Sequence, residues 1–283
     1  MLIDFSRCRT IPFQYGGRSS RKQCIIYKDE PYMLKLPCPL PGTEIENDVG
    51  IVVREYLGSQ IYASLGVPVH ETLLGTLNGL VVVACRHMQL PGEDFVDFST
   101  LKEDYLSTGG GCNAPSKSRD LRDTLEIVGK HPWLIAAGGA VERFWDMFVI
   151  DLLIDNFDRN NGNWGILTDR KAFRLAPVFD NGSCFGQIPN RAAEGKPMIG
   201  PHTRRLVFAG HNLTPFELMH GHGITACNHA LRRVKERFDL SGAEALIDEL
   251  GSVGLVASTQ ADAYCATLEE NFKKYFLHCI GTA

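Results

Sequence analysis

The sequence of 283 residues predicts an α+β fold with two lobes, a small β-rich N-terminal lobe and a larger, mainly helical C-terminal lobe. Three observations support this prediction. Short runs with strand-like alternation, separated by turn signals, are concentrated in the first 88 residues. From residue 120 onward, apolar residues recur mainly at helical spacing. Among these later segments lies a loop rich in Asn, Asp and Gly, whose residue types favour turns over a continued helix.

Composition and charge exclude several classes of protein. With 44% hydrophobic and 22% charged residues, the chain has the make-up of an ordinary globular protein. A net charge of −4 and a pI near 6.1 argue against direct nucleic-acid binding. No apolar run approaches the length of a membrane span, and no signal peptide is evident. The nine cysteines form no Cys-x-x-Cys pair, which favours reduced thiols and a cytoplasmic protein, with export as an effector left open.

A Gly/Ser-rich turn begins the N-terminal lobe and leads into a strand at residues 23–27. The turn contains Gly16, Gly17, Ser19 and Ser20. Glycines let backbone N–H groups approach phosphate oxygens, and serine hydroxyls add further donors. We therefore regard this turn as a candidate phosphate cradle, although a Gly-Gly pair also fits an ordinary tight turn.

Lys35 lies inside an apolar strand at residues 32–37, where a charge without a partner would be costly. Kinase-type sites place a lysine on such a strand to bind nucleotide phosphates, and a glutamate from a helix holds it. The next predicted helix, residues 47–65, offers Glu55. The alternative is a lysine on the exposed face of an edge strand, with Glu55 on a solvated helix face.

The turn Asn78-Gly79 is the strongest short-range hairpin signal in the chain. It separates strands at residues 69–77 and 80–88. The second strand is apolar from Leu80 to Cys85, which predicts that it is buried on both faces. The break that follows it predicts a linker between the two lobes.

The most informative residues lie in the loop after a predicted helix at residues 141–154. Asp158 is followed five residues later by Asn163, and Asp180 comes after a predicted hairpin with strands at residues 164–168 and 172–176. In kinase-type phosphoryl transfer, a loop Asp accepts the proton of the substrate hydroxyl and an Asn five residues later binds Mg²⁺. A second Asp, after a hairpin, holds the metal ions that bridge the phosphates. The spacing therefore indicates phosphoryl transfer.

The residues around these positions resemble the corresponding motifs of the HipA-type serine/threonine kinases. The matching features are Arg after Asp158, the run Leu175-Ala-Pro-Val-Phe-Asp180 and the turn Leu65-Gly-Val-Pro-Val69. The resemblance extends over roughly residues 10 to 280. Asn160 departs from the family, in which a His usually follows the Asp-Arg pair. The chain starts at the kinase core, so we expect a compact HipA-related kinase without the extra N-terminal subdomain.

This resemblance implies a two-lobed protein-kinase-like fold, with an N-lobe at residues 1–88 and a helical C-lobe at residues 89–283. It implies ATP and Mg²⁺ as cofactors. The order of the elements places a hinge at the end of the second hairpin strand, with backbone groups facing the adenine. The implied roles are Asp158 as the catalytic residue, Asn163 and Asp180 as metal ligands, and Gly16, Gly17, Ser19, Ser20, Lys35, Glu55, Arg86, His87 and Met88 as ATP-binding residues.

The family further implies a protein substrate with a Ser or Thr acceptor. An antitoxin-like regulatory partner and a role as a toxin or effector are open expectations. Ser19 and Ser20 are candidates for autophosphorylation because they lie in the turn that would meet ATP. Two alternatives stay open: a small-molecule or lipid phosphotransferase, and a nucleotide-binding pseudokinase. The combination of Lys35 with Asp158, Asn163 and Asp180 argues against the pseudokinase, because a scaffold has no chemical need for it.

Overall fold

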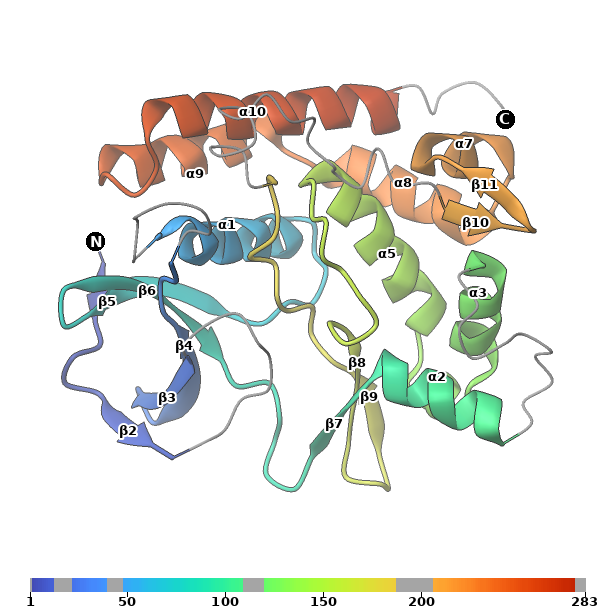
Figure 1. The fold of residues 1–283 in the computed structure, drawn as a ribbon, viewed down its shortest axis with the longest axis horizontal. Helices are drawn as coiled ribbons and strands as arrows, with labels where there is room; N and C mark the ends of the chain where they lie inside the picture. The colour runs from blue at the N-terminus through green and yellow to red at the C-terminus, as the bar shows by residue number, and fades with distance from the viewer. Residues whose placement is uncertain (1, 13–21, 40–47, 109–119, 187–205, 278–283) are drawn as a thin grey trace.

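The computed structural model describes residues 2–12, 22–39, 48–108, 120–186 and 206–277. Strands β2 to β6 gather at one end of the molecule, helices α2, α3, α5 and α8 lie at the other, and α9 and α10 run alongside α1 (Figure 1). The predicted two-lobed α+β fold is therefore confirmed. The predicted phosphate cradle at Gly16, Gly17, Ser19 and Ser20 lies outside the described residues.

A six-stranded sheet, in the order β1-β5-β6-β4-β3-β2, forms the N-terminal lobe. Its neighbours pair antiparallel except for β1 and β5, which are parallel. The strands are β1 (Ile3–Asp4), β2 (Arg9–Ile11), β3 (Lys22–Tyr27), β4 (Glu30–Lys35), β5 (Thr72–Leu77) and β6 (Leu80–Arg86). The predicted Asn78-Gly79 hairpin joins β5 to β6, and both turn residues have positive φ, 51° and 83°, as a two-residue hairpin turn requires.

Helix α1 (Gly50–Ser64) packs against one face of this sheet. On that face, Val83 and Cys85 of β6 pack with Val52 of α1. Lys35 shares the face, because it pairs with Val83 in register across the two strands. Strand β4 lies between β3 and β6, and Lys35 is only 5% exposed. The alternative of a lysine on the exposed face of an edge strand is therefore wrong.

The C-terminal lobe combines helices with two small sheets. One sheet has the order β7-β8-β9, and the other is the antiparallel pair β10 and β11. Its described elements are β7 (Asp94–Asp97), α2 (Phe98–Ser107), α3 (Leu121–Lys130), α4 (Pro132–Ala137), α5 (Ala140–Leu153), β8 (Gly165–Thr168), β9 (Phe173–Leu175), β10 (Leu206–Phe208), β11 (His211–Leu213), α7 (Pro215–Gly221), α8 (Thr225–Arg237), α9 (Leu240–Ser252), α10 (Ser258–Phe272) and the π-helix η2 (Lys273–Leu277). None of the described helices combines the length and the apolar character needed to cross a membrane.

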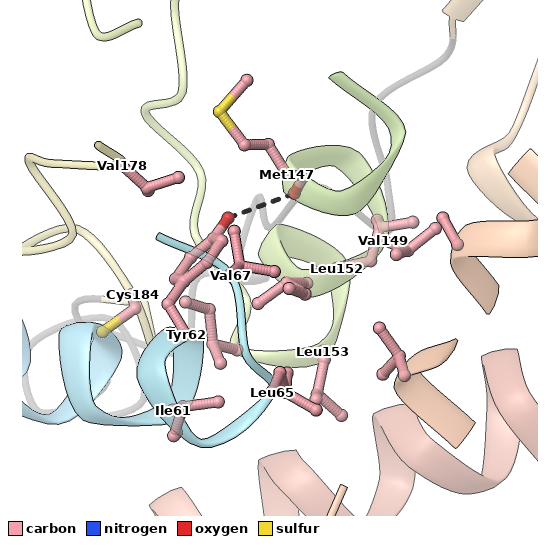
Figure 2. Packing of buried hydrophobic residues seen from close by; sticks show 14 of the residues in the cluster. Ile61, Tyr62, Leu65, Val67, Met147, Val149, Leu152, Leu153, Val178 and Cys184 are labelled. Atoms are coloured by element: carbon pink, nitrogen blue, oxygen red, sulfur yellow. Dashed lines mark hydrogen bonds between the residues drawn. The ribbon is translucent and has the colours of Figure 1, made fainter. Parts of the chain in front are cut away.

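The largest hydrophobic core joins α1 to the C-terminal lobe. Ile61 and Tyr62 of α1 pack in one cluster with Met147 and Leu152 of α5, and Val178 lies beside them (Figure 2). The Tyr62 hydroxyl has two acceptors in reach, Asp151 Oδ1 at 2.8 Å and the Met147 carbonyl oxygen at 3.3 Å, so its polar end is satisfied inside the core. Helix α1 therefore has a sheet on one side and the helical lobe on another, and a shift of α1 would disturb both.

The strand pairs at β3/β4 and β8/β9 and the helix α5 lie where periodicity predicts them, within a few residues. The predicted helix at residues 47–65 is described only from Gly50, and helices α3, α7, α8, α9 and α10 lie in the part beyond residue 120 that was predicted to be mainly helical. The elements β1, β2, β7, β10, β11, α2 and α4 were not predicted. They are short or sit beside Pro and Gly, so their periodicity is weak. The lobe boundary between residues 88 and 89 stays a prediction.

Candidate active site

Strand β4 and helix α1 bring Lys35 and Glu55 together. Lys35 Nζ lies 2.7 Å from Glu55 Oε2, and the Glu55 side chain is fully buried. Burial opposes the charge on both groups, but each ion outweighs that effect on the other. The pKa of Lys35 is raised, with Asp180 adding to the effect, and the pKa of Glu55 is lowered, with His70 adding to it. The ammonium and the carboxylate are thus both held in their charged forms.

Glu55 has a second partner that sequence reasoning missed. His70 Nε2 lies 3.0 Å from Glu55 Oε1, and both side chains are buried. Cys85 is close enough for Glu55, His70 and Cys85 to offer three donor atoms of the kinds that bind metals, all within 4.8 Å of one another. We interpret this cluster as a hydrogen-bonded support, because Lys35 already supplies a cation beside Glu55.

Lys35 also contacts Asp180, from the segment that follows β9. The distance from Lys35 Nζ to Asp180 Oδ1 is 2.7 Å, and the Asp180 side chain remains 45% exposed. Asp180 has a φ of 58°, in the left-handed region that non-glycine residues rarely adopt. Lys35 thus bridges a buried carboxylate and one that reaches solvent.

The backbone after Asp180 lies tightly against α1. A Cβ added to Gly182 would lie 3.0 Å from Ile51 Cγ1 and 3.2 Å from Glu55 Oε2. Arg54 Nε donates a hydrogen bond to the Gly182 carbonyl oxygen at 3.1 Å. A glycine is needed here because α1 and this segment approach too closely for a side chain.

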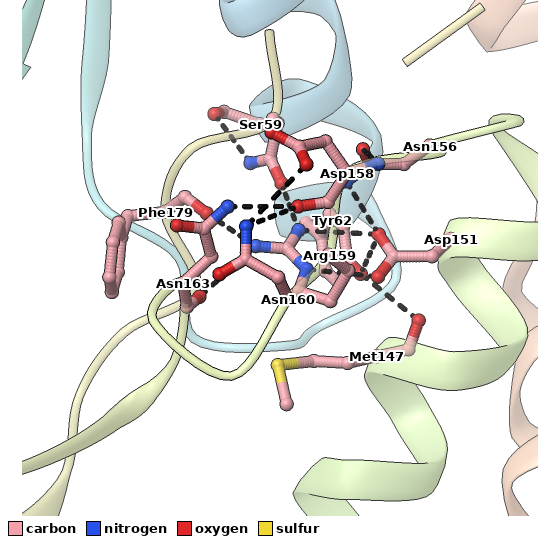
Figure 3. A network of polar contacts seen from close by, with 11 residues as sticks. Ser59, Tyr62, Met147, Asp151, Asn156, Asp158, Arg159, Asn160, Asn163 and Phe179 are labelled. Atoms are coloured by element: carbon pink, nitrogen blue, oxygen red, sulfur yellow. Dashed lines mark hydrogen bonds and ion pairs between the residues drawn. The ribbon is translucent and has the colours of Figure 1, made fainter. Parts of the chain in front are cut away.

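A second buried ion pair lies beneath the loop that follows α5. Arg159 Nε is 2.9 Å from Asp151 Oδ2, and both side chains are nearly buried. Asp151 Oδ1 also accepts hydrogen bonds from the Tyr62 hydroxyl at 2.8 Å and from Asn156 Nδ2 at 2.9 Å. Figure 3 shows these groups converging from α1, α5 and the loop. The shared partners satisfy the buried charge of Asp151.

Arg159 connects the loop of Asp158 to the segment of Asp180. Its Nη1 donates to the Phe179 carbonyl oxygen at 2.5 Å, and its Nη2 donates to Asn181 Oδ1 at 2.6 Å. These acceptors are the residues immediately before and after Asp180. The Arg159 guanidinium therefore determines how the two segments lie relative to each other.

Within the loop, Asn163 Nδ2 donates to the Asp158 carbonyl oxygen at 2.9 Å. Asn160 Nδ2 donates to the same oxygen at 3.2 Å and lies 3.5 Å from Asp158 Oδ1, while Asn160 Oδ1 accepts from the Gly162 backbone N–H. Asp158 itself is exposed. The asparagines therefore shape the loop while the Asp158 carboxylate faces accessible space.

The predicted hinge residues follow the end of β6. The backbone N–H groups of Arg86 and His87 donate to Glu71 and Pro31, and the Met88 carbonyl oxygen accepts from Arg174. These three backbone groups thus have protein partners, and the adenine contact of this segment stays a prediction.

The structure therefore brings Lys35, Glu55 and Asp180 into direct contact, and joins them through Arg159 to Asp158 and Asn163. Sequence reasoning missed the positions of His70 and Asp151. A weak signal existed for Asp151, because a charge lay beside the apolar stripe of a predicted helix. For His70 there was none, because no regular spacing relates residue 70 to residue 55.

Comparison with known proteins finds similarity to a serine/threonine kinase. No protein-family model matches the chain. The serine/threonine-protein kinase CtkA of Helicobacter pylori (strain J99 / ATCC 700824) is 38% identical over 187 residues, which is 65% of this chain and 56% of that kinase. The aligned part thus spans little more than half of the relative's length.

Solved structures extend the similarity over more of the chain. The crystal structure of the Helicobacter pylori proinflammatory kinase CtkA matches with a TM-score of 0.80 and 27% identity, covering 99% of this chain and 96% of that one. A complex of the toxin–antitoxin proteins HipA and HipB with operator DNA from Shewanella oneidensis MR-1 matches with a TM-score of 0.54 and 13% identity, over 94% of this chain and 68% of that one. The second likeness concerns the fold alone. The expected kinase-like fold is confirmed.

Proposed function

We propose that this chain, a homologue of CtkA among the HipA-like serine/threonine kinases, transfers the γ-phosphoryl group of ATP to a Ser or Thr hydroxyl of a protein. The observation that carries the proposal is the contact of one buried ammonium, Lys35 Nζ, with both Glu55 and Asp180 at 2.7 Å. Kinase-type phosphoryl transfer requires such a lysine held by a helix glutamate and placed beside the metal-binding aspartate.

The residues present fit a magnesium ion. Mg²⁺ prefers oxygen ligands and keeps several waters, so a site needs only one or two protein oxygens that reach solvent. The Asp180 carboxylate is 45% exposed. Asn163 uses its amide nitrogen to donate to Asp158, and none of the residues described donates to its amide oxygen. We assign Asp180 and Asn163 as the protein ligands, and a bound Mg²⁺ would supply positive charge to the phosphate oxygens.

The remaining residues orient and polarise the reactants. Lys35 contributes a permanent positive charge to the phosphates, because Glu55 and Asp180 raise its pKa despite burial. Asp158 accepts the proton of the acceptor hydroxyl through its exposed carboxylate, while Asn160 and Asn163 donate to its backbone carbonyl oxygen. The turn at residues 16–22 covers the phosphates, and the segment of Arg86, His87 and Met88 meets the adenine. Little covalent chemistry is asked of the protein, so positioning accounts for most of the rate.

The finer points of the proposal concern the setting of the reaction. We assign a protein substrate, autophosphorylation at Ser19 and Ser20, and a cytoplasmic protein. A HipB-like regulatory partner and a toxin or effector role are extensions suggested by the toxin–antitoxin protein HipA, whose fold is similar. We also retain the division into an N-lobe at residues 1–88 and a C-lobe at residues 89–283.

The test is incubation of the purified protein with γ-labelled ATP and Mg²⁺, with a basic protein as acceptor. We expect label on protein for the wild type and none for Asp180→Ala. The matched control is Asp29→Ala, because Asp29 is exposed in the β3–β4 turn; this variant is expected to label normally. Label that persists in Asp180→Ala would contradict the assignment. Release of labelled inorganic phosphate without labelled protein would show transfer to water and would contradict a protein acceptor.

Autophosphorylation needs a separate measurement. We expect mass spectrometry to find phosphate at Ser19 or Ser20 in protein expressed with an intact site, and none in protein carrying Asp158→Asn. Equal phosphate in both preparations would contradict self-modification.

A further inference from the structure

His70 contacts Glu55 and also lines a pocket whose wall includes Arg86, His87 and Met88, the segment proposed to meet the adenine. The pocket has a volume of about 930 Å³, and neither Lys35 nor Asp180 lines it. Its walls come from the turn before β4, the segment before β5, the end of β6 with the residues that follow, and the region of β9. Besides His70, the wall includes Pro31, Glu71, Met88 and Pro177. A small molecule bound in this pocket would therefore lie against His70.

Both oxygens of Glu55 have a partner. Oε2 contacts Lys35 and Oε1 contacts His70, and the carboxylate is fully buried. An imidazole with a proton on Nε2 donates a hydrogen bond to Glu55 Oε1 across the 3.0 Å that separates them. Without this donor, Oε1 would be a buried, charged oxygen lacking a hydrogen bond, a state that drives a side chain to rotate or to take up a proton.

His70 also reaches the other partner of Lys35. Its backbone N–H donates to the Val178 carbonyl oxygen at 2.9 Å, and Val178 lies two residues before Asp180. The residue thus touches Glu55 with its side chain and the segment leading to Asp180 with its backbone. A side-chain substitution at His70 removes the first contact and leaves the backbone hydrogen bond in place.

On these contacts we infer that His70 is a positioning residue for phosphoryl transfer: its imidazole holds Glu55 in the orientation that fixes Lys35 on the phosphates. The inference rests on the proposed kinase function. It assigns His70 no contact with the nucleotide or the acceptor. Its effect is therefore expected mainly in kcat measured at saturating ATP, because Glu55 and Lys35 act at the phosphate end of the nucleotide.

The main experiment uses His70→Gly with added imidazole. Removing the side chain opens a space continuous with the pocket that His70 lines. We expect kcat to fall by about tenfold to a hundredfold, the scale of effect that misplacement of a reacting group produces. Free imidazole, which has an N–H donor, should restore part of this activity. The matched probe 1-methylimidazole has nearly the same shape, and at an assay pH well above the pKa of free imidazoles it is neutral, has no N–H and should restore none.

Two variants provide controls. Lys35→Ala should be inactive with or without imidazole, because the group that His70 positions is missing. His70→Gln, which keeps an N–H donor, should be more active than His70→Leu, which fills the space without one. Wild-type kcat in His70→Leu would overturn the inference. So would a folded His70→Gly protein whose lost activity responds equally to imidazole and 1-methylimidazole, or to neither.

A measurement without catalysis separates this inference from the proposed function. The free energies of unfolding of His70→Leu, Glu55→Gln and the double variant form a thermodynamic cycle. We expect the two changes to be non-additive, since the second loses little once the first has removed the hydrogen bond. Additive changes would contradict the contact even if the protein proves to be a kinase. Non-additive changes in a protein that labels no substrate would contradict the kinase assignment alone.

Discussion

Arg159 and Asp151 form an ion pair beneath the loop of Asp158, with Nε 2.9 Å from Oδ2 and Nη2 3.2 Å from Oδ1. The same guanidinium holds the residues on either side of Asp180. One buried side chain thereby ties the proposed catalytic loop and the proposed metal-binding segment to α5. The geometry of the site depends on it more than on any direct contact between the two segments in the described part of the chain.

Replacing Arg159 by Met should destabilise the protein by about 3 to 5 kcal/mol, because Asp151 would be left as a buried charge with fewer partners. Denaturant unfolding measures the loss. Lys273→Met is the control, since the pair Lys273 and Glu269 is exposed on α10 and η2 and should contribute far less. If both variants unfold at the same denaturant concentration, the pair does not support the site.

Asp158→Asn should lower kcat by a factor of about 10² to 10⁴ while leaving the unfolding midpoint unchanged. The reason is that the Asp158 carboxylate is exposed and its one described side-chain contact, Asn160 Nδ2 at 3.5 Å, is long. Label transfer and thermal unfolding are measured on the same preparation. A large loss of stability would show that the carboxylate supports the loop instead.

The stability of the protein should depend on Glu55 in a pH-dependent manner. Burial opposes its ionisation, but Lys35 and His70 outweigh burial, so its pKa is lowered from the ordinary value of 4.5. At pH values above 4.5, Glu55 is ionised in both the folded and the unfolded protein, and its contribution to stability is complete. As the pH falls below it, the unfolded state takes up the proton first, and the effect is progressively lost.

The comparison to make is the free energy of unfolding of the wild type and Glu55→Gln between pH 3 and pH 7. We expect the advantage of the wild type to shrink as the pH falls below about 4.5. Glu103→Gln, at an exposed position on α2, should match the wild type throughout. A difference that stays constant over the range, or grows in acid, would contradict a lowered pKa for Glu55.

Glycines beside α1 offer a test of close packing. In Gly58→Ala the new Cβ would lie 2.9 Å from Asn181 Cβ and 3.1 Å from Cys184 Sγ, so we expect the free energy of unfolding to fall by about 1 to 3 kcal/mol and label transfer to slow. Gly129→Ala is the matched control on α3, where a Cβ meets nothing within 4 Å and the helix should gain slightly. Equal stability of the two variants would mean that the α1 contact is looser than described.

The elements that sequence predicted well are those with local signals. The Asn78-Gly79 hairpin requires positive φ that these residues supply, and α5 shows a long apolar stripe. Lys35 could be singled out because a lysine among apolar strand residues demands a partner. The short helix α4 and strand β7 carry too few residues for periodicity to be read.

The positions of His70 and Asp151 could not be predicted for a different reason. Their contacts join residues that the sequence does not relate: His70 reaches Glu55 from beyond the C-terminal end of α1, and Asp151 reaches Tyr62 across the core. Such contacts follow from tertiary packing, which no local pattern encodes. The motif spacing identified which residues to bring together, but not which side chains hold them there.

Lys35 and Asp180 are in contact although 145 positions separate them in the sequence. Asn271 of α10 donates a hydrogen bond to the Leu153 carbonyl oxygen of α5, 118 positions away. During synthesis, therefore, the ribosome releases the β-rich lobe well before Asp180 exists, and Lys35 then has only Glu55 as its described acidic neighbour. The contact between Lys35 and Asp180 can therefore form only once the segment after β9 has been made.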